Sequence, residues 1–326
     1  MCVAGRGLPP KNGVKGHGLQ RLLPDYQRTT LVRRGFITLL LVGIGILLAT
    51  RVGAQEAIEF EATQPFSADK LLLKAELFRP NGPGHFPAVV MLHGCGGWQP
   101  AVHYSLNTHA RYLQQRGFVV LNVDSFGPRH SSGGKLCADD RALYKALSYR
   151  TEDAFDALRY LQKLDYVAPD NIFLMGQSNG GAVAIRVAKT ATSEAHDNGG
   201  AAFRGVVAYY PWCGEFGSSR VSLASPLLIF AGGRDDWVPA RQCQNVKATG
   251  AGLEVTIYPE AAHSFDLDIL PQRFLGKLIG SDPLATQDSR AKMLAFFIST
   301  MTDGLKRQYA ARELTTTLAQ NTSFKQ

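Results

Sequence analysis

Apolar runs of strand length alternate along the chain with longer segments in which apolar residues recur at helical spacing. A run that is apolar at nearly every position, such as Gly117–Val123, is typical of a strand buried on both faces of a parallel sheet. Ala57–Ala62 and Leu71–Phe78 are predicted to pair as an opening hairpin. The further predicted strands are Phe86–Leu92, Gly117–Val123, Ile172–Met175, Gly205–Tyr210, Pro226–Ala231 and Leu253–Tyr258.

The segments between these strands have the composition of helices. Asp153–Leu164 brings its large apolar side chains to one face, Ala182–Ala188 is rich in small residues, and Ala291–Met301 is expected to close the fold. Strands that alternate with helices predict an α/β fold, with a mostly parallel central sheet covered by helices on both faces. Residues Leu305–Gln326 are polar, and we expect a loose, exposed tail there.

The turn between Ile172–Met175 and Ala182–Ala188 carries the most specific pattern of the chain. Gly176–Gly180 has the glycine–serine–glycine spacing of a nucleophile elbow, which requires a strand before it and a helix after it. Such a turn forces its central residue into strained backbone angles, and the flanking glycines remove the Cβ atoms that would collide there. Ser178 is therefore the predicted nucleophile.

An acid and a histidine follow this serine in the order that the elbow requires. Asp235 comes directly after the strand Pro226–Ala231 and a glycine turn, and His263 comes after the strand Leu253–Tyr258. A serine becomes nucleophilic when a histidine takes its proton and a carboxylate orients the imidazole. We predict these roles for His263 and Asp235. Neighbouring Asp236 is the alternative acid, whereas Asp266 and Asp268 follow the histidine and fit the required order less well.

A glycine-rich loop follows the predicted strand Phe86–Leu92. Loops at this position supply half of the oxyanion hole in folds of this kind. The predicted donors are the backbone N–H of Cys95 in this loop and the backbone N–H of Asn179, the residue after the nucleophile.

Several blocks in the same order resemble the dienelactone hydrolase family of α/β-hydrolases. The resemblance extends from about Phe60 to Ile298. It is carried by His93–Gly97, Val123–Arg129, Arg150 with Asp153 and Asp156, Gly176–Gly181, Asp235–Pro239 and Ala262–Asp266. The chain departs from the family's name-giving enzymes, which use cysteine at the elbow and a glutamate in the loop after the third strand. Here these positions hold Ser178 and Gly94, so the resemblance implies a serine esterase more than an enzyme for dienelactone itself.

The predicted function is hydrolysis of a carboxylic ester or lactone by Ser178, His263 and Asp235, without a cofactor. The alternatives are a small peptidase or amidase with the same triad, and an inactive binding protein of the hydrolase fold. His103 and His109 have no third ligand at metal-site spacing, so no metal site is predicted.

Two side chains are candidates for substrate binding. Arg129 ends a strand at the edge of the sheet where α/β folds bind ligands, so it could pair with a substrate carboxylate. The alternative for Arg129 is a structural salt bridge within its loop. Trp237 is a candidate pocket wall, although aromatic residues at strand ends are also common in cores.

Residues 1–54 have the features of an export signal, which leaves residues 55–304 as the catalytic domain. Arg33 and Arg34 precede the uncharged apolar run Phe36–Thr50, as in twin-arginine signals, and Val52–Ala54 resembles a cleavage site. The alternative is a membrane anchor, but fifteen helical residues span only about 22 Å of a bilayer core of roughly 30 Å. We expect a periplasmic or secreted protein that meets the membrane only through an uncleaved signal.

Charge and cysteine content agree with this division. The formal net charge is +8, of which residues 1–54 contribute +7, so the basic balance gives no ground for nucleic-acid binding. Cys95, Cys137, Cys213 and Cys243 remain in the mature chain, an even number that suits an oxidising compartment. Among the three possible pairings we favour one that includes Cys213–Cys243, which would brace the acid loop. The alternative is four free buried thiols.

Overall fold

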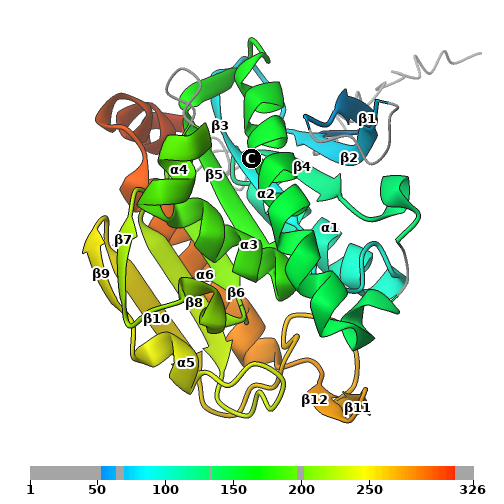
Figure 1. Ribbon diagram of the computed structural model, residues 1–326. Helices are drawn as coiled ribbons and strands as arrows, with labels where there is room; N and C mark the ends of the chain where they lie inside the picture. Colours follow the sequence, from blue (N-terminus) through cyan, green and yellow to red (C-terminus); the bar gives the residue numbers. More distant parts are fainter. Residues whose placement is uncertain (1–52, 64–69, 132–133, 197–201, 313–326) are drawn as a thin grey trace, which may run out of the picture. The chain divides into compact units, whose positions relative to one another are not determined.

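The computed structural model describes residues 53–63, 70–131, 134–196 and 202–312 (Figure 1). Residues 50–326 form one compact unit, and the description that follows concerns this unit. Nearly all of the predicted export signal lies outside the described residues. The described chain enters its first strand at Ala54, the last residue before the predicted mature domain.

The predicted strands are present, together with several shorter ones. The strands are β1 Ala54–Glu61, β2 Leu72–Arg79, β3 Phe86–Leu92, β4 Val119–Asp124, β5 Val167–Gln177, β6 Val206–Tyr209, β7 Arg220–Leu223, β8 Leu227–Gly232, β9 Lys247–Gly250, β10 Leu253–Tyr258, β11 Gln272–Phe274 and β12 Lys277–Ile279. The helices are α1 Pro100–Gln114, α2 Asp140–Gln162, α3 Asn179–Ala188, α4 Thr190–His196, α5 Arg241–Gln244 and α6 Pro283–Thr300, with short 3-10 turns η1 Gly127–Arg129, η2 Leu136–Ala138 and η3 Cys213–Phe216.

Eight strands form one sheet in the order β1-β2-β4-β3-β5-β6-β8-β10. The strand β2 runs antiparallel to β1 and β4, as the predicted hairpin requires, and the later pairs are all parallel. The sheet is therefore mostly parallel, and the prediction of an α/β fold is confirmed.

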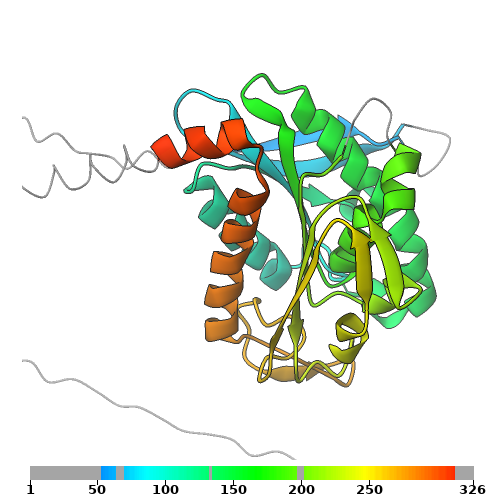
Figure 2. The same cartoon turned by 90° about the vertical axis from the view of Figure 1, so that its left-hand side faces the viewer.

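Helices cover both faces of the sheet (Figure 2). One core cluster packs the apolar side chains of α2 and α3 against the sheet, and the other packs α1 and α6 against the opposite face. Every residue of β3, β4 and β8 is buried, which explains why these strands are continuous apolar runs in the sequence.

The predicted start of the helix α2 and the predicted C-terminal tail both need correction. α2 begins at Asp140, where Asp139 caps the helix by accepting the Ala142 N–H, so the helix is longer than the predicted Asp153–Leu164. Residues 303–312 are helical rather than a loose tail. Leu305 and Tyr309 are buried against the α1 and α6 side of the sheet, because the apolar side chains of this segment recur at helical spacing.

Two disulfides cross-link loops near the carboxyl ends of the parallel strands. The favoured pair, Cys213–Cys243, joins η3 to α5. The other two cysteines, Cys95 and Cys137, also form a disulfide, which joins the loop after β3 to η2.

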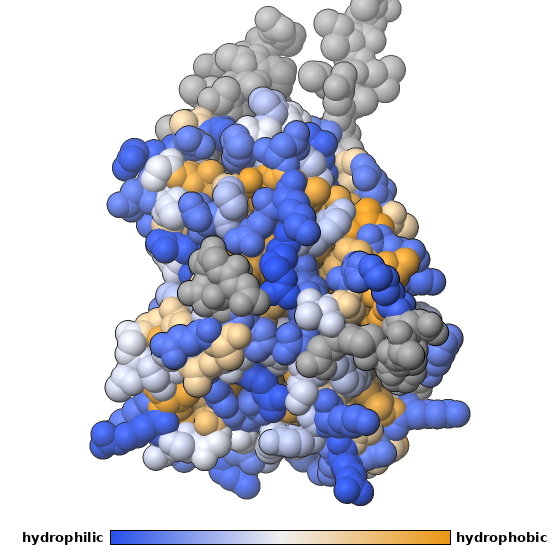
Figure 3. Space-filling model, turned by 45° about the horizontal axis from the view of Figure 1, so that its top comes forward, coloured by the Kyte–Doolittle hydropathy of each residue, from blue (hydrophilic) through white to orange (hydrophobic). Residues whose placement is uncertain are grey.

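The face shown in Figure 3 is mainly hydrophilic, with groups of apolar residues between hydrophilic ones. Within the described ranges, no helix combines the length and the apolar character needed to cross a membrane.

Candidate active site

Ser178 stands at the turn between β5 and α3, in a backbone conformation that side chains rarely adopt. Its φ of 51° and ψ of −111° place it in a strained region, directly before the first residue of α3. A Cβ at Gly176 would collide with the Gly180 carbonyl, and one at Gly180 would lie 2.5 Å from the Leu92 carbonyl oxygen. Glycine at both positions therefore permits this tight turn.

His263 lies between Ser178 and Asp235. Its Nε2 is 3.0 Å from Ser178 Oγ, and its Nδ1 is 2.7 Å from Asp235 Oδ2. Both the imidazole and the carboxylate are buried, with exposed fractions of 3% and 6%. This arrangement can transfer the hydroxyl proton to the ring and hold the resulting cation against a carboxylate.

The second oxygen of Asp235 is also bonded. Asp235 Oδ1 accepts the backbone N–H groups of Trp237 and Val238, at 2.9 and 2.8 Å. The rival acid, Asp236, is exposed and points elsewhere. It accepts the Leu278 N–H and pairs with Arg273, and so it fastens the β11–β12 hairpin.

Two backbone N–H groups beside Ser178 are free. Those of Cys95 and Asn179 donate no hydrogen bond within the described part of the chain. The loop that carries Cys95 passes very close to the serine, because a Cβ at Gly94 would lie 3.2 Å from Ser178 Cβ. Glycine at position 94 thus permits this close approach of the loop to the nucleophile.

Arg150, from α2, connects the two segments that carry these N–H groups. Its guanidinium donates to the His93 carbonyl oxygen and to Asn179 Oδ1, both at 2.6 Å. The side chain is fully buried, and this burial lowers the pKa of Arg150 from its usual range to about 10. The sequence marked Arg150 only as part of a resemblance, because its partners are distant along the chain.

Arg129 is fully engaged inside the protein. Its two terminal nitrogens each lie 2.8 Å from an oxygen of Asp153, and one also donates to the Ser125 carbonyl. Only 3% of the residue is exposed. Arg129 therefore forms a structural salt bridge and does not face a substrate carboxylate, but its partner Asp153 lies on α2 and not, as the alternative interpretation proposed, within its own loop.

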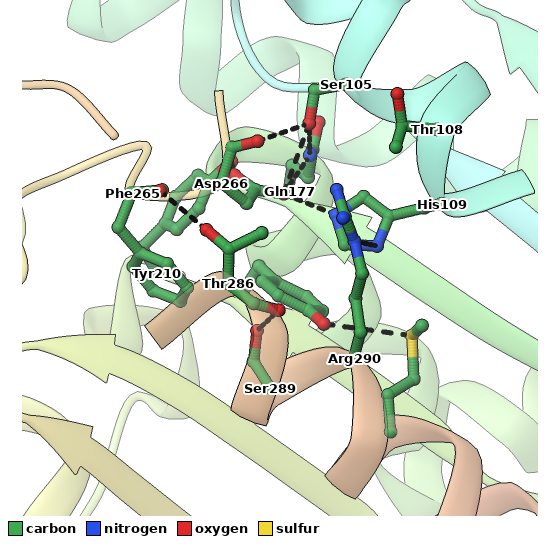
Figure 4. Close-up of polar contacts among 12 residues, drawn as sticks. Ser105, Thr108, His109, Gln177, Tyr210, Phe265, Asp266, Thr286, Ser289 and Arg290 are labelled. Carbon is green, nitrogen blue, oxygen red and sulfur yellow. Dashed lines mark hydrogen bonds and ion pairs between the residues drawn. The ribbon is translucent and has the colours of Figure 1, made fainter. Parts of the chain in front are cut away.

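A second buried polar cluster is centred on Asp266 (Figure 4). Asp266 accepts hydrogen bonds from His109, Tyr210 and Gln177, at 2.7, 2.5 and 2.6 Å. Burial alone would raise the pKa of Asp266, but these donors outweigh it and hold the pKa below its usual range. Because Gln177 precedes Ser178 and the Tyr210 ring packs on His263 at 4.8 Å, this cluster supports both sides of the serine–histidine contact.

Two cavities open beside Ser178. The hairpin pocket, of about 120 Å³, also borders His263, and its walls include the Cys95–Cys137 disulfide, Tyr210, and Phe274 and Ile279 of the hairpin. The helix pocket, of about 520 Å³, is lined by Leu143, Tyr144 and Leu147 of α2, by Asn179 and Ala182 of α3, and by Trp212. Trp237, the predicted pocket wall, borders both cavities.

Among the described residues, no three His, Cys, Asp or Glu side chains converge in a way that could hold a metal ion. His103 bonds to Glu76, and His109 bonds to Asp266. The short strands β11 and β12, which form part of the wall of the hairpin pocket, could not be recognised in the sequence, because their polar and mixed composition resembles that of ordinary loops.

A family profile and a curated relative both match this chain. The dienelactone hydrolase family profile matches residues 73–301. A probable 2-oxo-3-(5-oxofuran-2-ylidene)propanoate lactonase of a Bradyrhizobium species is 26% identical over 212 residues, which are 59% of this chain and 78% of that protein.

Solved structures share the fold at low sequence identity. A dienelactone hydrolase-like promiscuous phosphotriesterase from metagenomic libraries has a TM-score of 0.57 at 19% identity, over 77% of this chain and all of that one. Thermogutta terrifontis esterase 2 has a TM-score of 0.53 at 21% identity, over 74% of this chain and 94% of that one.

The fold and the family match together define an α/β-hydrolase that acts on carboxylic esters or lactones. More particularly, the chain belongs to the dienelactone hydrolase family.

Proposed function

We propose that the protein cleaves its ester or lactone through an acyl-enzyme intermediate on Ser178. The observation that carries this proposal is the continuous chain of hydrogen bonds from Asp235 through His263 to Ser178, which ends at a strained turn. The lactonase relative supports a substrate of this chemical class.

In the first step, Ser178 Oγ attacks the carbonyl carbon and its proton passes to His263 Nε2. The Cys95 and Asn179 N–H groups stabilise the negative oxygen, a contribution of about 2.7–4 kcal/mol for each such donor. The bond from carbon to the alcohol oxygen then breaks, and Nε2 returns the proton to that oxygen. A water activated by His263 attacks the acyl group, and the acid is released while Ser178 regains its proton.

Asp235 would fix the tautomer of the imidazole. Since Asp235 Oδ1 already accepts two backbone N–H groups, an asparagine at this position would present its NH₂ group to His263 Nδ1. The ring would then carry its proton on Nε2 and could not accept one from the serine.

This reasoning gives the first prediction. Asp235→Asn should lower kcat by roughly 10³–10⁴-fold, whereas Asp236→Asn should retain most of it, since Asp236 contacts only the exposed hairpin. Steady-state kinetics of the two variants on a short-chain ester measures the difference, and a larger loss for Asp236→Asn would assign the acid to that residue.

Labelling with a fluorophosphonate tests the nucleophile itself. The wild-type protein should be modified at Ser178, and Ser178→Ala should be neither labelled nor active. An unlabelled wild-type protein would favour an inactive binding protein. Faster turnover of amides than of matched esters would instead favour a peptidase or amidase.

We also propose that the mature domain is exported. The twin-arginine-like segment and the two disulfides support this localisation. Fractionation of cells that express the full chain should place the mature protein outside the cytoplasm, and replacement of Arg33 and Arg34 by lysine should retain it inside.

A further inference from the structure

We propose that the substrates of this site are uncharged esters that join a large apolar acyl group to a small alcohol. The inference rests on the proposed serine mechanism and deepens it. It concerns which part of the substrate occupies which of the two cavities beside Ser178.

The linings of both cavities favour an uncharged substrate. Among the described residues that line the hairpin pocket there is no lysine, arginine, aspartate or glutamate, and the ionisable groups are His263 and the phenol of Tyr210. The helix pocket has one cation and one anion, Lys277 and Asp140. The Lys277 ammonium donates to the Asp236 carbonyl oxygen at 3.0 Å, and Asp140 is exposed at the start of α2.

A substrate carboxylate would therefore find no free guanidinium in the described part of the site. Arg129 is paired with Asp153, and Arg150 is fully buried between the two oxyanion segments. Moving a carboxylate from water into an apolar cavity is costly unless a cation pairs with it. In the helix pocket the charge of Lys277 is offset by Asp140 and by the nearby Asp236 carboxylate, so neither cavity offers an uncompensated cation and both select against charged substrates.

The sizes of the cavities differ about fourfold, at 120 and 520 Å³. An apolar protein cavity of about 150 Å³ holds one benzene molecule. The hairpin pocket is thus suited to a group of a few carbon atoms. The helix pocket has room for an aromatic ring and a linker, and its mouth is flanked by the partly exposed rings of Tyr144 and Trp212.

The position of His263 assigns the two halves of the ester. When the carbon–oxygen bond breaks, the proton on Nε2 passes to the departing alcohol oxygen, and the acyl carbon stays bonded to Ser178 Oγ. The alcohol must therefore leave on the side of His263, which borders the hairpin pocket and not the helix pocket. The acyl group then lies in the helix pocket, beside Asn179, Leu147 and Ala182.

Two isomeric esters test this assignment. Ethyl phenylbutanoate has the large group on the acyl side, and phenylbutyl acetate has it on the alcohol side, while their atoms and overall hydrophobicity are the same. We expect kcat/KM to be at least about tenfold higher for ethyl phenylbutanoate, because even one extra or missing methylene in an apolar pocket changes kcat/KM by about tenfold or more. Equal or reversed values would overturn the assignment.

Two matched variants test which cavity holds the acyl group and which holds the alcohol. Leu143→Phe narrows the helix pocket and should lower kcat/KM for ethyl phenylbutanoate while sparing ethyl acetate. Val102 also lines the hairpin pocket, and Val102→Phe should narrow that pocket, sparing methyl phenylbutanoate while abolishing turnover of phenylbutyl acetate. Retained turnover of the small esters shows that each variant is folded, and exchanged effects of the two variants would contradict the proposal.

Charge is tested with monoethyl adipate, in which a free carboxylate occupies the distal end of the acyl chain. We expect its kcat/KM to be at least about tenfold below that of ethyl hexanoate, and comparable values would overturn the inference of an uncharged substrate. If neither these esters, ethyl acetate included, nor a lactone is cleaved, the proposed function itself fails, whereas cleavage of lactones alone refutes only the present inference. Cleavage of all the esters with the wrong preference likewise refutes only the present inference.

Discussion

At the scale of single residues, the buried Arg150 holds together two segments that are distant along the chain. Its nitrogens reach both the His93 carbonyl and the Asn179 side chain, next to the N–H groups proposed to bind the oxyanion. A lysine offers a single nitrogen at this place and cannot reproduce both contacts. Arg150 is thus a positioning residue, which acts through the backbone on either side.

Arg150→Lys should lower kcat by about tenfold to a hundredfold with little change in KM, because the donors matter most in the transition state. Arg129→Lys is the matched control, since Arg129 is equally buried but contacts Asp153 and not the donors. Both variants should lose stability in thermal denaturation. An equal loss of kcat in the two would show that Arg150 is merely structural.

The site residues that the sequence could predict are those whose neighbours along the chain define a turn. Ser178, Asp235 and His263 each follow a strand, so their common edge was predictable. The direction in which a long side chain points could not be predicted from the sequence. Arg129 lies at the expected edge but turns inward, because Asp153 on the neighbouring helix is within reach.

At the scale of elements, the two disulfides provide a controlled comparison. They close segments of similar length, with sequence separations of 42 and 30. Removal of either one should therefore cost a similar free energy of unfolding, about 3–4 kcal/mol in a chain-entropy account. Only Cys95–Cys137 lines the hairpin pocket next to Ser178.

The double variant Cys95→Ala/Cys137→Ala should lose about tenfold in kcat, because the loop that carries the Cys95 N–H is released. Cys213→Ala/Cys243→Ala should keep its kcat at a temperature where both variants are folded. Urea denaturation and ester kinetics measure the two effects separately. A loss of kcat confined to the second variant would contradict this assignment.

The elements that could be predicted are those with a continuous apolar face. β3, β4 and β8 are buried at every position, so their sequences identify them. β11 and β12 have only three residues each, and β11 is exposed while β12 is partly buried, so no apolar pattern marks them. Their position depends on distant contacts, such as the hydrogen bond from the Leu278 N–H to Asp236.

At the scale of the whole molecule, two buried histidines make the free energy of unfolding depend on pH. Burial holds the pKa of His93 and of His109 below 6.5. Both rings also accept a hydrogen bond that a protonated ring would lose. His93 Nε2 accepts the Ser125 N–H, and His109 Nδ1 accepts the Arg290 Nε–H while Nε2 donates to Asp266.

The unfolded chain takes up protons at these histidines below about pH 6.5, whereas the folded protein does not. The free energy of unfolding should therefore be full above that pH and fall as the pH drops below about 6.5 toward the lowered pKa of each folded-state ring, by at most about 1.4 kcal/mol per pH unit for each histidine. Urea denaturation across this range measures the slope. His109→Gln keeps a donor for Asp266 and should make the slope shallower, whereas an unchanged slope would exclude His109 as a source.

The link through Arg150 has a consequence for how this enzyme can be recombined with its relatives. The loop at His93, the middle of α2 and the start of α3 meet at one guanidinium, so none of them is an independent module. A chimera that imports one of these three segments alone would inherit a mismatched half of the site. The three are transferable only as a set, even though more than eighty residues separate the first from the last.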